Sequence, residues 1–260
     1  MINQTLNKLH SMNLKAMEEE YRRQLELSIS NSLSFDERLA MMVDAQWLAK
    51  ANSRLKRLLR EANLGNPSAS LEDLNYDPKR NLDKATIARL SDCTWIKEGK
   101  NLIITGATGT GKTYLISAFG HAACRKGLKV RSYKVNRLLV DLAISRGDSS
   151  YNRLLGELKK PDLLILDDFG MAPLSPSACR DFLEVIDDRH DKKSIAISAQ
   201  LPVAKWHAQF EDATIADAVL DRLINNAYRI ELKGPSLRAT AHKNGGGWYQ
   251  SLIIYVKLQT

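Results

Sequence analysis

Apolar residues recur at helical spacing along the first 64 positions, and no stretch there alternates as a strand would. The clearest helix begins after Ser34, which is followed three residues later by Glu37 in a capping-box pattern. Its apolar positions keep the helical period and are Phe35, Leu39, Met42, Val43, Trp47, Leu55, Leu58 and Leu59. The pattern therefore predicts an all-helical region at the start of the chain.

A stripe of basic residues lies on the same predicted helix, beside the apolar face. Lys50, Arg54, Arg57 and Arg60 fall within about 120° of one another when each residue advances the helix by about 100°. A one-sided basic stripe next to a buried face could bind the phosphates of a nucleic acid. A merely solvated helix face has the same pattern, so the sequence leaves both interpretations open.

The pattern changes after residue 64. The segment 65–70, Gly-Asn-Pro-Ser-Ala-Ser, is rich in turn-forming residues and predicts a domain boundary. Beyond it, short apolar runs alternate with helical segments, which is typical of an α/β fold with a parallel sheet covered on both faces. Strands are expected at 101–105, 130–133, 163–166, 194–197 and 227–232. Helices are expected at 81–90, 113–125, 138–145, 151–159, 177–190, 203–210 and 215–226.

The loop between the first predicted strand and its helix, residues 106–113, fits the phosphate-binding pattern G-x-x-x-x-G-K-[ST] in full. Its glycines allow a tight turn whose backbone N–H groups can surround a β-phosphate. Lys112 is expected to reach the β- and γ-phosphates, and the Thr113 hydroxyl to complete a Mg²⁺ shell. The sequence thus predicts a site for ATP or a similar nucleoside triphosphate. The expected nucleotide-binding residues are Gly106, Ala107, Thr108, Gly109, Thr110, Gly111, Lys112, Thr113 and Tyr114.

Two acidic residues, Asp167 and Asp168, follow the apolar run 163–166. A buried strand that ends in acids is the second half of a phosphate-loop site. We expect Asp167 to hold Mg²⁺ and Asp168 to orient the attacking water as a base. Carboxylates that only cap the next segment are the alternative. The side chain of Asp168 is shorter than that of Glu, which is consistent with slow turnover.

Four further residues are candidates for sensing or completing this site. A polar side chain after the strand 194–197 would lie between the acids and the γ-phosphate; Gln200 is the first choice and Ser198 the second. An arginine supplied by a neighbouring subunit can neutralise transition-state charge at the γ-phosphate. Arg222 and Arg238 are placed late in the chain, but spacing alone does not select them.

Composition limits the class of protein. A chain of 260 residues, 44% of them hydrophobic, can form one sizeable α/β domain and a small second one. The net charge of +8 favours an anionic partner such as nucleic acid. Three dispersed cysteines and five dispersed histidines argue against a disulfide framework and a zinc site. No apolar run approaches the ~20 residues of a membrane span and no signal-peptide pattern opens the chain, so we expect a cytoplasmic protein without a membrane partner.

The linked motifs resemble the IstB family, the ATP-dependent helper subunits of bacterial insertion-sequence transposases. The motifs that carry the resemblance are 103–114 with 120–125, 164–170 with 172–174, 200–203 with Trp206 and His207, and 217–223 with 229–232. The family belongs to the AAA+ class and is related to the helicase loader DnaC and the initiator DnaA. The resemblance implies an AAA+ P-loop NTPase, a three-layer αβα fold with a five-stranded parallel sheet. The expected divisions are a helical domain at 1–66, the ATPase domain at 67–238 and a divergent tail at 239–260, where the resemblance ends.

The resemblance also implies roles for individual residues. Lys112, Thr113 and Asp167 would bind Mg-ATP and Asp168 would assist hydrolysis, while Gln200, Arg222 and Arg238 would be the first sensor, the trans-acting arginine finger and the second sensor. Ala199 stands where relatives usually have Ser. The implied protein is an ATPase that oligomerises on duplex DNA with ATP sites at subunit interfaces. It would deform the DNA and recruit and stimulate a partner transposase.

Three alternatives remain at this point. A DnaC-like helicase loader has the same fold and site but uses its N-terminal region to hold a helicase. A nucleoside or metabolite kinase shares the phosphate loop, yet has no need of Arg222 or of a basic helical domain. A nucleotide-gated DNA scaffold would use ATP only to join subunits, with negligible turnover.

Overall fold

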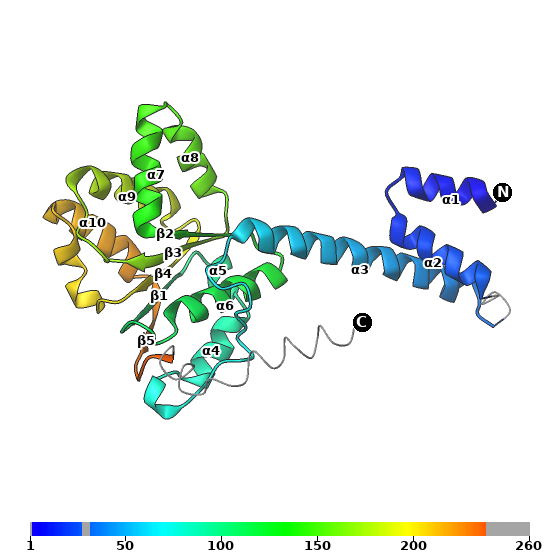
Figure 1. The fold of residues 1–260 in the computed structure, drawn as a ribbon, viewed down its shortest axis with the longest axis horizontal. Helices are drawn as coiled ribbons and strands as arrows, with labels where there is room; N and C mark the ends of the chain where they lie inside the picture. Colours follow the sequence, from blue (N-terminus) through cyan, green and yellow to red (C-terminus); the bar gives the residue numbers. More distant parts are fainter. Residues whose placement is uncertain (1, 28–31, 238–260) are drawn as a thin grey trace, which may run out of the picture. The chain divides into compact units, whose positions relative to one another are not determined.

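The computed structural model describes residues 2–27 and 32–237. The chain divides into two compact units, residues 1–58 and 59–260. The first is built from helices, and the second surrounds a five-stranded sheet with helices on both faces (Figure 1). Arg238 and the expected tail at 239–260 lie outside the described residues.

Hydrogen bonds join the helices of the N-terminal unit. It contains α1 (Ile2–Ser11), α2 (Lys15–Glu26) and most of α3 (Phe35–Ala62). The amide of Gln24 is buried and donates to the Arg38 carbonyl on α3 at 3.0 Å. The backbone N–H of Met17 donates to Gln46 Oε1 at 3.3 Å. These two hydrogen bonds join α2 to α3.

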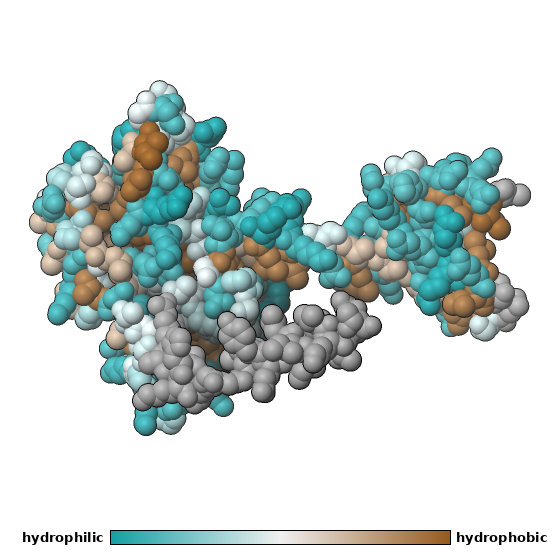
Figure 2. Space-filling model, viewed as in Figure 1, coloured by the Kyte–Doolittle hydropathy of each residue, from teal (hydrophilic) through white to brown (hydrophobic). Residues whose placement is uncertain are grey.

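The start of α3 is capped as the sequence predicts. The Glu37 carboxylate accepts the Ser34 backbone N–H at 2.8 Å, and Ser34 Oγ accepts the Glu37 N–H at 3.3 Å. The apolar stripe that follows is not uniformly buried, which differs from the expected buried face. Phe35 is 70% exposed and Trp47 is 67% exposed, whereas Leu58 is buried. Helices of 10 and 12 residues are too short to cover a helix of 28 residues, and Figure 2 shows apolar surface among the polar side chains of this unit.

The second unit alternates strands and helices. Its strands are β1 (Asn101–Gly106), β2 (Val130–Lys134), β3 (Leu163–Phe169), β4 (Ser194–Ala199) and β5 (Ala227–Leu232). Its helices are α4 (Lys84–Ser91), α5 (Thr94–Lys97), α6 (Lys112–Arg125), α7 (Val135–Gly147), α8 (Tyr151–Lys159), α9 (Pro176–Arg189) and α10 (Ala213–Ile224). A 3₁₀ turn, η2 (Pro78–Arg80), precedes α4. All five predicted strands are confirmed.

The sheet is wholly parallel, in the order β2-β3-β4-β1-β5. Its strands carry continuous apolar runs because helices cover both faces. Strand β4 lies between β1 and β3, so the segments that follow these three strands meet at one edge. That edge is where parallel α/β sheets bind ligands.

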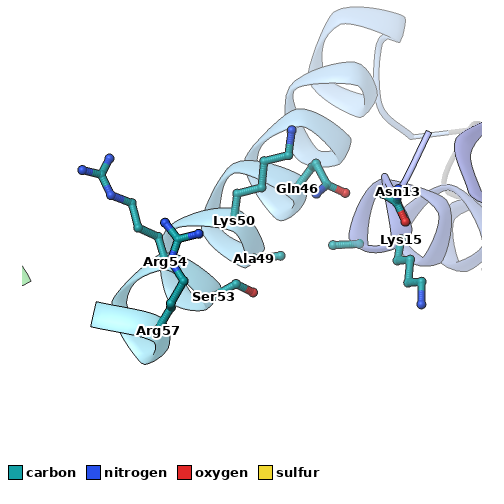
Figure 3. Close-up of a pocket in the computed structure, with 9 residues that line it drawn as sticks. Asn13, Lys15, Gln46, Ala49, Lys50, Ser53, Arg54 and Arg57 are labelled. Carbon is teal, nitrogen blue, oxygen red and sulfur yellow. The ribbon is translucent and has the colours of Figure 1, made fainter. Parts of the chain in front are cut away.

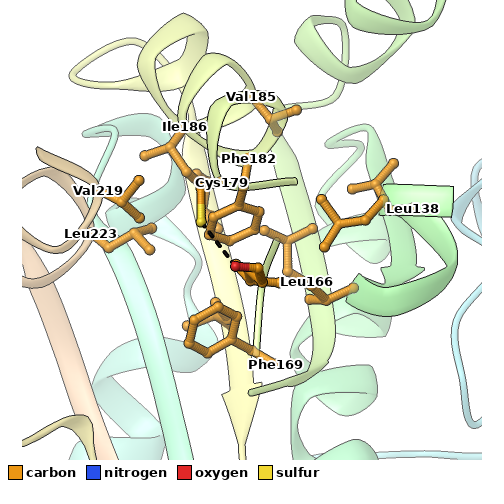
Figure 4. Close-up of a cluster of buried hydrophobic side chains, with 14 of the residues drawn as sticks. Leu138, Leu166, Phe169, Cys179, Phe182, Val185, Ile186, Val219 and Leu223 are labelled. Atoms are coloured by element: carbon orange, nitrogen blue, oxygen red, sulfur yellow. Dashed lines mark hydrogen bonds between the residues drawn. The ribbon is translucent and has the colours of Figure 1, made fainter. Parts of the chain in front are cut away.

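Side chains of β3 alternate between the two faces of the sheet. Ile165 faces α6, since a Cβ at Gly120 would lie 3.0 Å from its Cδ1. Leu166 faces the opposite layer and belongs to the buried cluster with α7, α9 and α10 (Figure 4). Phe169 ends the strand in the same cluster, with ring centroids 5.5 Å from Phe182. Asp168, the residue before it, is thereby held next to this core.

The helix expected at 203–210 is wrong in detail. The chain forms two 3₁₀ turns instead, η3 (Val203–Lys205) and η4 (His207–Gln209). Trp206 between them is fully buried, and its indole N–H donates to the Leu201 carbonyl at 3.0 Å. The Trp206 N–H donates to the Val203 carbonyl at 3.0 Å and the Phe210 N–H to the His207 carbonyl at 3.2 Å, so each turn closes over three residues rather than the four of an α-helix.

Candidate nucleotide site

The phosphate loop joins β1 to α6, as predicted. Gly106 has φ +152°, and a Cβ there would lie 2.4 Å from the Leu232 carbonyl oxygen on β5. Gly109 has φ +83°, and a Cβ there would lie 2.1 Å from Ser236 Oγ. Both positions therefore require glycine, for backbone conformation and for space.

The side chains of the loop converge on its own backbone. Lys112 is only 6% exposed, and its Nζ donates to the Ala107 carbonyl at 2.9 Å. Thr110 Oγ1 donates to the same carbonyl at 2.8 Å. The ammonium thus lies inside the curve of the loop, where it can meet a phosphate. The predicted residue Tyr114 points elsewhere: its hydroxyl accepts the Ser70 N–H at 3.2 Å.

The loop and the acidic end of β3 come together at the start of α6. Thr113 Oγ1 donates to Asp167 Oδ2 at 3.0 Å. Asp167 is 4% exposed, and its other carboxylate oxygen accepts a hydrogen bond from Ser198 Oγ. A hydroxyl and a buried carboxylate at one point are the hard oxygen donors that Mg²⁺ prefers. The two residues predicted as metal ligands are therefore adjacent.

Asp168 has an unusual backbone and a basic neighbour. Its φ is +61°, in the left-handed region, and the pairing of β3 with β4 shifts register between Leu166 and Phe169. Its N–H donates to Ser198 Oγ at 3.2 Å. Its carboxylate lies 3.4 Å from the ammonium of Lys134, at the end of β2. A non-glycine residue in this conformation is a form of local strain that clusters at functional sites.

The two sensor candidates occupy different places at this edge. Ser198 contacts both acids, as described above. Gln200 lies at the phosphate loop, where its Oε1 accepts a hydrogen bond from Thr108 Oγ1 at 2.8 Å. Its amide nitrogen lies 3.0 Å from Met171 Sδ. Ser198, the second choice from sequence, is thus nearer the acids than Gln200.

Residues 65 and 66 lie within the second unit and pack on α6, beside Thr113. The Asn66 N–H donates to Ser117 Oγ at 3.2 Å, and the Asn66 carbonyl lies 3.1 Å from His121 Nε2. A Cβ at Gly65 would lie 3.1 Å from Thr113 Cγ2. The turn-rich break at 65–70 is therefore also a wall of the nucleotide site.

Arg222 lies far from the loop of its own chain. Its carbonyl accepts a hydrogen bond at 3.2 Å from Asn101, the first residue of β1, whereas the phosphate loop follows the last. Its guanidinium pairs with Asp187 at 2.6 Å and donates to the Ala218 carbonyl at 2.8 Å. The second arginine, Arg238, lies outside the described residues.

The predicted basic stripe forms part of a groove in the N-terminal unit. Figure 3 shows Lys50, Arg54 and Arg57 on successive turns of α3, with Lys15 at the start of α2. The groove has a volume of about 560 Å³. It is lined by Asn13, Lys15, Ala16, Gln46, Ala49, Lys50, Ser53, Arg54 and Arg57, so cations and neutral groups line it without a carboxylate. Arg60 is exposed further along α3 and does not line it.

Other kinds of site find no support in the described part of the chain. Residues 2–27 and 32–237 hold no group of three or more His, Cys, Asp or Glu side chains arranged to bind a metal ion. The helices among them include none that is long and apolar enough to cross a membrane. All three cysteines are buried, and burial raises the pKa of Cys93 and of Cys124 to about 11.

Comparison with known proteins agrees with the motifs. The model of a family described as IstB-like ATP binding protein matches residues 7–245. The chain belongs to the IstB-like family. An insertion sequence ATP-binding protein of Sinorhizobium fredii is 41% identical over 234 residues, which cover 90% of this chain and 95% of that protein. The ATP-binding protein of insertion sequence IS1162 from Pseudomonas fluorescens is 44% identical over 202 residues, 78% of this chain and 87% of that protein.

The solved structure of DnaI shares the fold of this IstB-like chain. It matches with a TM-score of 0.55 and 23% identity, over 68% of this chain and 94% of DnaI. The fold is thus that of an AAA+ P-loop NTPase preceded by a helical region, as the resemblance implied. The family match reaches residue 245, which is farther than the expected end at Arg238, and residues 246–260 lie outside it.

Sequence reasoning missed several residues of this site. Lys134 ends a strand and has no motif around it, so nothing in the sequence links it to Asp168. Arg80 lies in a short 3₁₀ turn and reaches the phosphate loop from outside it. Asn66 was included in the predicted break, but no feature of the sequence predicted that it packs on α6. Each is brought to the site by tertiary structure.

Proposed function

We propose that this IstB-like protein hydrolyses ATP and uses its ATP-bound form to hold duplex DNA for a partner transposase. One observation carries the proposal. Thr113 on the phosphate loop and Asp167 at the end of β3 share a hydrogen bond of 3.0 Å, with Asp168 the next residue along the chain. This brings both halves of a phosphate-loop hydrolysis site together in a family whose relatives are insertion sequence ATP-binding proteins.

The proposed chemistry assigns one task to each side chain. Lys112 binds the β- and γ-phosphates, and the loop N–H groups surround the β-phosphate. Asp168 orients the attacking water and accepts its proton. Ser198 Oγ donates to the Asp167 carboxylate and accepts the Asp168 backbone N–H, so it holds the Asp167 carboxylate and the Asp168 main chain in place. Gln200, at the rim of the loop, is suited to detect the γ-phosphate.

Mg²⁺ fits the donors that meet at the loop. Thr113 and Asp167 would hold the ion, because a hydroxyl and a carboxylate at 3.0 Å can share one hard cation and leave positions for water and phosphate oxygens. When bound, it would neutralise phosphate charge. The described residues offer no competing cluster of acids.

The proposed DNA-binding surface is the basic groove of the N-terminal unit. Lys15, Lys50, Arg54 and Arg57 bring four cations to one groove, together with the neutral donors of Gln46 and Ser53. Cations and amide or hydroxyl groups are the usual partners of backbone phosphates, and such contacts do not read bases. We therefore infer binding to duplex DNA with weak sequence preference.

Assembly into an oligomer is proposed from Arg222. Its position at the far end of the sheet separates it from the loop of its own chain. An arginine finger works from a neighbouring subunit, so that a site is complete only between two copies. Two exposed apolar side chains of α3, Phe35 at its start and Trp47 further along, offer a surface to a second copy or to the transposase.

The first experiment measures ATP turnover and oligomeric size, with and without duplex DNA, in ATP and in ADP. We expect turnover that rises with DNA and an assembly that forms on DNA in ATP. ATP binding with assembly but negligible turnover would instead support the scaffold alternative. If the protein stays monomeric and DNA changes neither its size nor its turnover, the proposal is overturned. A small-molecule phosphoryl acceptor would then be the substrate to test for.

A second experiment tests the groove. Reversing charge in Arg54→Glu with Arg57→Glu should weaken DNA binding and flatten its salt dependence, because fewer counterions are released. Lys56→Glu is the matched control: Lys56 is exposed on the same helix and does not line the groove. Equal salt slopes for the double variant and the wild type would remove the groove from the interface.

A further inference from the structure

A buried arginine lies against the phosphate loop and has no part in the chemistry above. Arg80, at the end of η2, is 7% exposed. Its Nη2 donates to the Thr110 carbonyl at 3.0 Å and its Nη1 to the Asn75 carbonyl at 2.7 Å. Both acceptors are neutral backbone groups. Burying a cation costs free energy, and these two bonds offset only part of it.

The contact with Thr110 fixes the orientation of one peptide unit of the loop. In a trans peptide the C=O and the next N–H point in opposite directions. The Thr110 carbonyl points at Arg80, on the outside of the loop, and the N–H of Gly111 therefore points to the inside. That N–H is one of the donors that the phosphate-binding pattern directs at the β-phosphate.

The guanidinium also brings charge close to the loop backbone. A Cβ at Gly111 would lie only 3.1 Å from Arg80 Nη2. A hydrogen bond from a cation to the carbonyl polarises the whole peptide and strengthens its N–H as a donor. Burial lowers the pKa of Arg80, but an arginine keeps its proton at neutral pH.

Arg80 further joins the loop to the last described segment of the chain. Its carbonyl accepts the Lys233 N–H at 3.1 Å. The Leu237 N–H donates to the Gly109 carbonyl at 2.9 Å, and this anchors the same segment on the loop. Three stretches distant in sequence thus meet around Arg80, and each of these hydrogen bonds has a backbone carbonyl as its acceptor.

We propose that Arg80 is a positioning residue for the β-phosphate: it orients and polarises the Thr110–Gly111 peptide. The inference rests on the nucleotide binding in the proposed function and needs neither hydrolysis nor DNA. It predicts which nucleotides depend on this residue for binding. Nucleotides with a β-phosphate, ATP and ADP alike, should depend on Arg80, while AMP should not.

The test measures equilibrium binding of fluorescent ADP and ATP, and competition by AMP, on folded protein from size exclusion. Arg80→Met should raise the Kd of ADP and ATP by about tenfold or more, which corresponds to loss of a charge-assisted hydrogen bond. The competition constant of AMP should stay the same. Arg80→Lys restores the charge without the forked geometry and should fall between wild type and Arg80→Met.

Arg89→Met is the matched control, because Arg89 is an exposed arginine stacked 5.3 Å from the ring of Tyr228. It should bind all three nucleotides as the wild type does. Unchanged ADP affinity in Arg80→Met, or an equal loss for AMP and ADP, would overturn the inference. If Arg80→Met does not fold, the same comparison is made with Arg80→Lys, which should weaken binding of ADP but not of AMP. Wild-type protein that binds no nucleotide would instead overturn the proposed function.

Discussion

Replacing Lys134 with methionine should speed ATP hydrolysis in the absence of DNA. The ammonium of Lys134 lies 3.4 Å from the Asp168 carboxylate, the group proposed to activate water. The ion pair holds this carboxylate toward Lys134, at the β2 side of the site, and it must be released before the carboxylate can turn to a water at the γ-phosphate. Methionine keeps the apolar length of the lysine and removes only the charge.

The size of the effect follows from exposure. The side chain of Lys134 is 70% exposed and that of Asp168 is 32% exposed, so water screens the pair. Exposed ion pairs contribute about 0.2–1 kcal/mol. If release of the pair is needed before each turnover, its loss should raise the basal rate by up to about fivefold.

Phosphate release at saturating ATP, measured at low and at high salt, checks this. Salt should raise the wild-type rate toward that of Lys134→Met, because screening weakens the same ion pair. The variant itself should respond little. Lys160→Met, at an exposed lysine that follows α8, is the control for removal of a surface charge. An unchanged or lower basal rate in Lys134→Met would refute the idea that Lys134 restrains Asp168.

Three further changes test the site. Asp168→Asn should bind ATP as the wild type does but hydrolyse it at least about tenfold more slowly, since the base is lost; loss of ATP binding in this variant would contradict the assignment. Gly109→Ala should lower the free energy of unfolding by about 1–2 kcal/mol from its positive φ alone, measured by denaturant unfolding, and should weaken nucleotide binding, measured by titration. Gly147→Ala is the control and should not destabilise the protein, because a Cβ added there meets nothing within 4 Å. Arg222→Ala should abolish turnover at nearly unchanged ATP affinity, and mixing it with inactive Lys112→Ala should restore part of the rate; no recovery would argue against action between subunits.

The sequence predicted the sheet and the phosphate loop because these are local patterns. Short apolar segments between helical patterns predict the strands. Gly106 and Gly109 fix the loop conformation, because a Cβ there would collide with β5 or with Ser236. The two acids at the end of β3 were found because they directly follow a run of four apolar residues. Thr113 and Asp167 then meet because only β4 separates β1 from β3 and because α6 packs on β3.

Contacts between distant segments could not be predicted in this way. Lys134 reaches Asp168 because β2 pairs with β3, and Arg80 reaches Thr110 from 30 residues away. Neither residue belongs to a motif. The exposed apolar positions of α3 could not be predicted for a different reason. Helical periodicity predicts an apolar face, but not whether other elements cover it. The helix expected at 203–210 is two short turns instead, on either side of the buried Trp206.

The position of Arg222 makes an isolated chain an incomplete enzyme under the proposed mechanism. Asn101, which hydrogen-bonds the Arg222 carbonyl, begins β1, and the phosphate loop starts where that strand of six residues ends. At about 3.3 Å per residue the strand spans roughly 16–20 Å, which is more than an arginine side chain can bridge. The ion pair with Asp187 also holds the guanidinium at the far end. If Arg222 completes an ATP site, that site belongs to another copy, and ATP turnover reports assembly as much as chemistry.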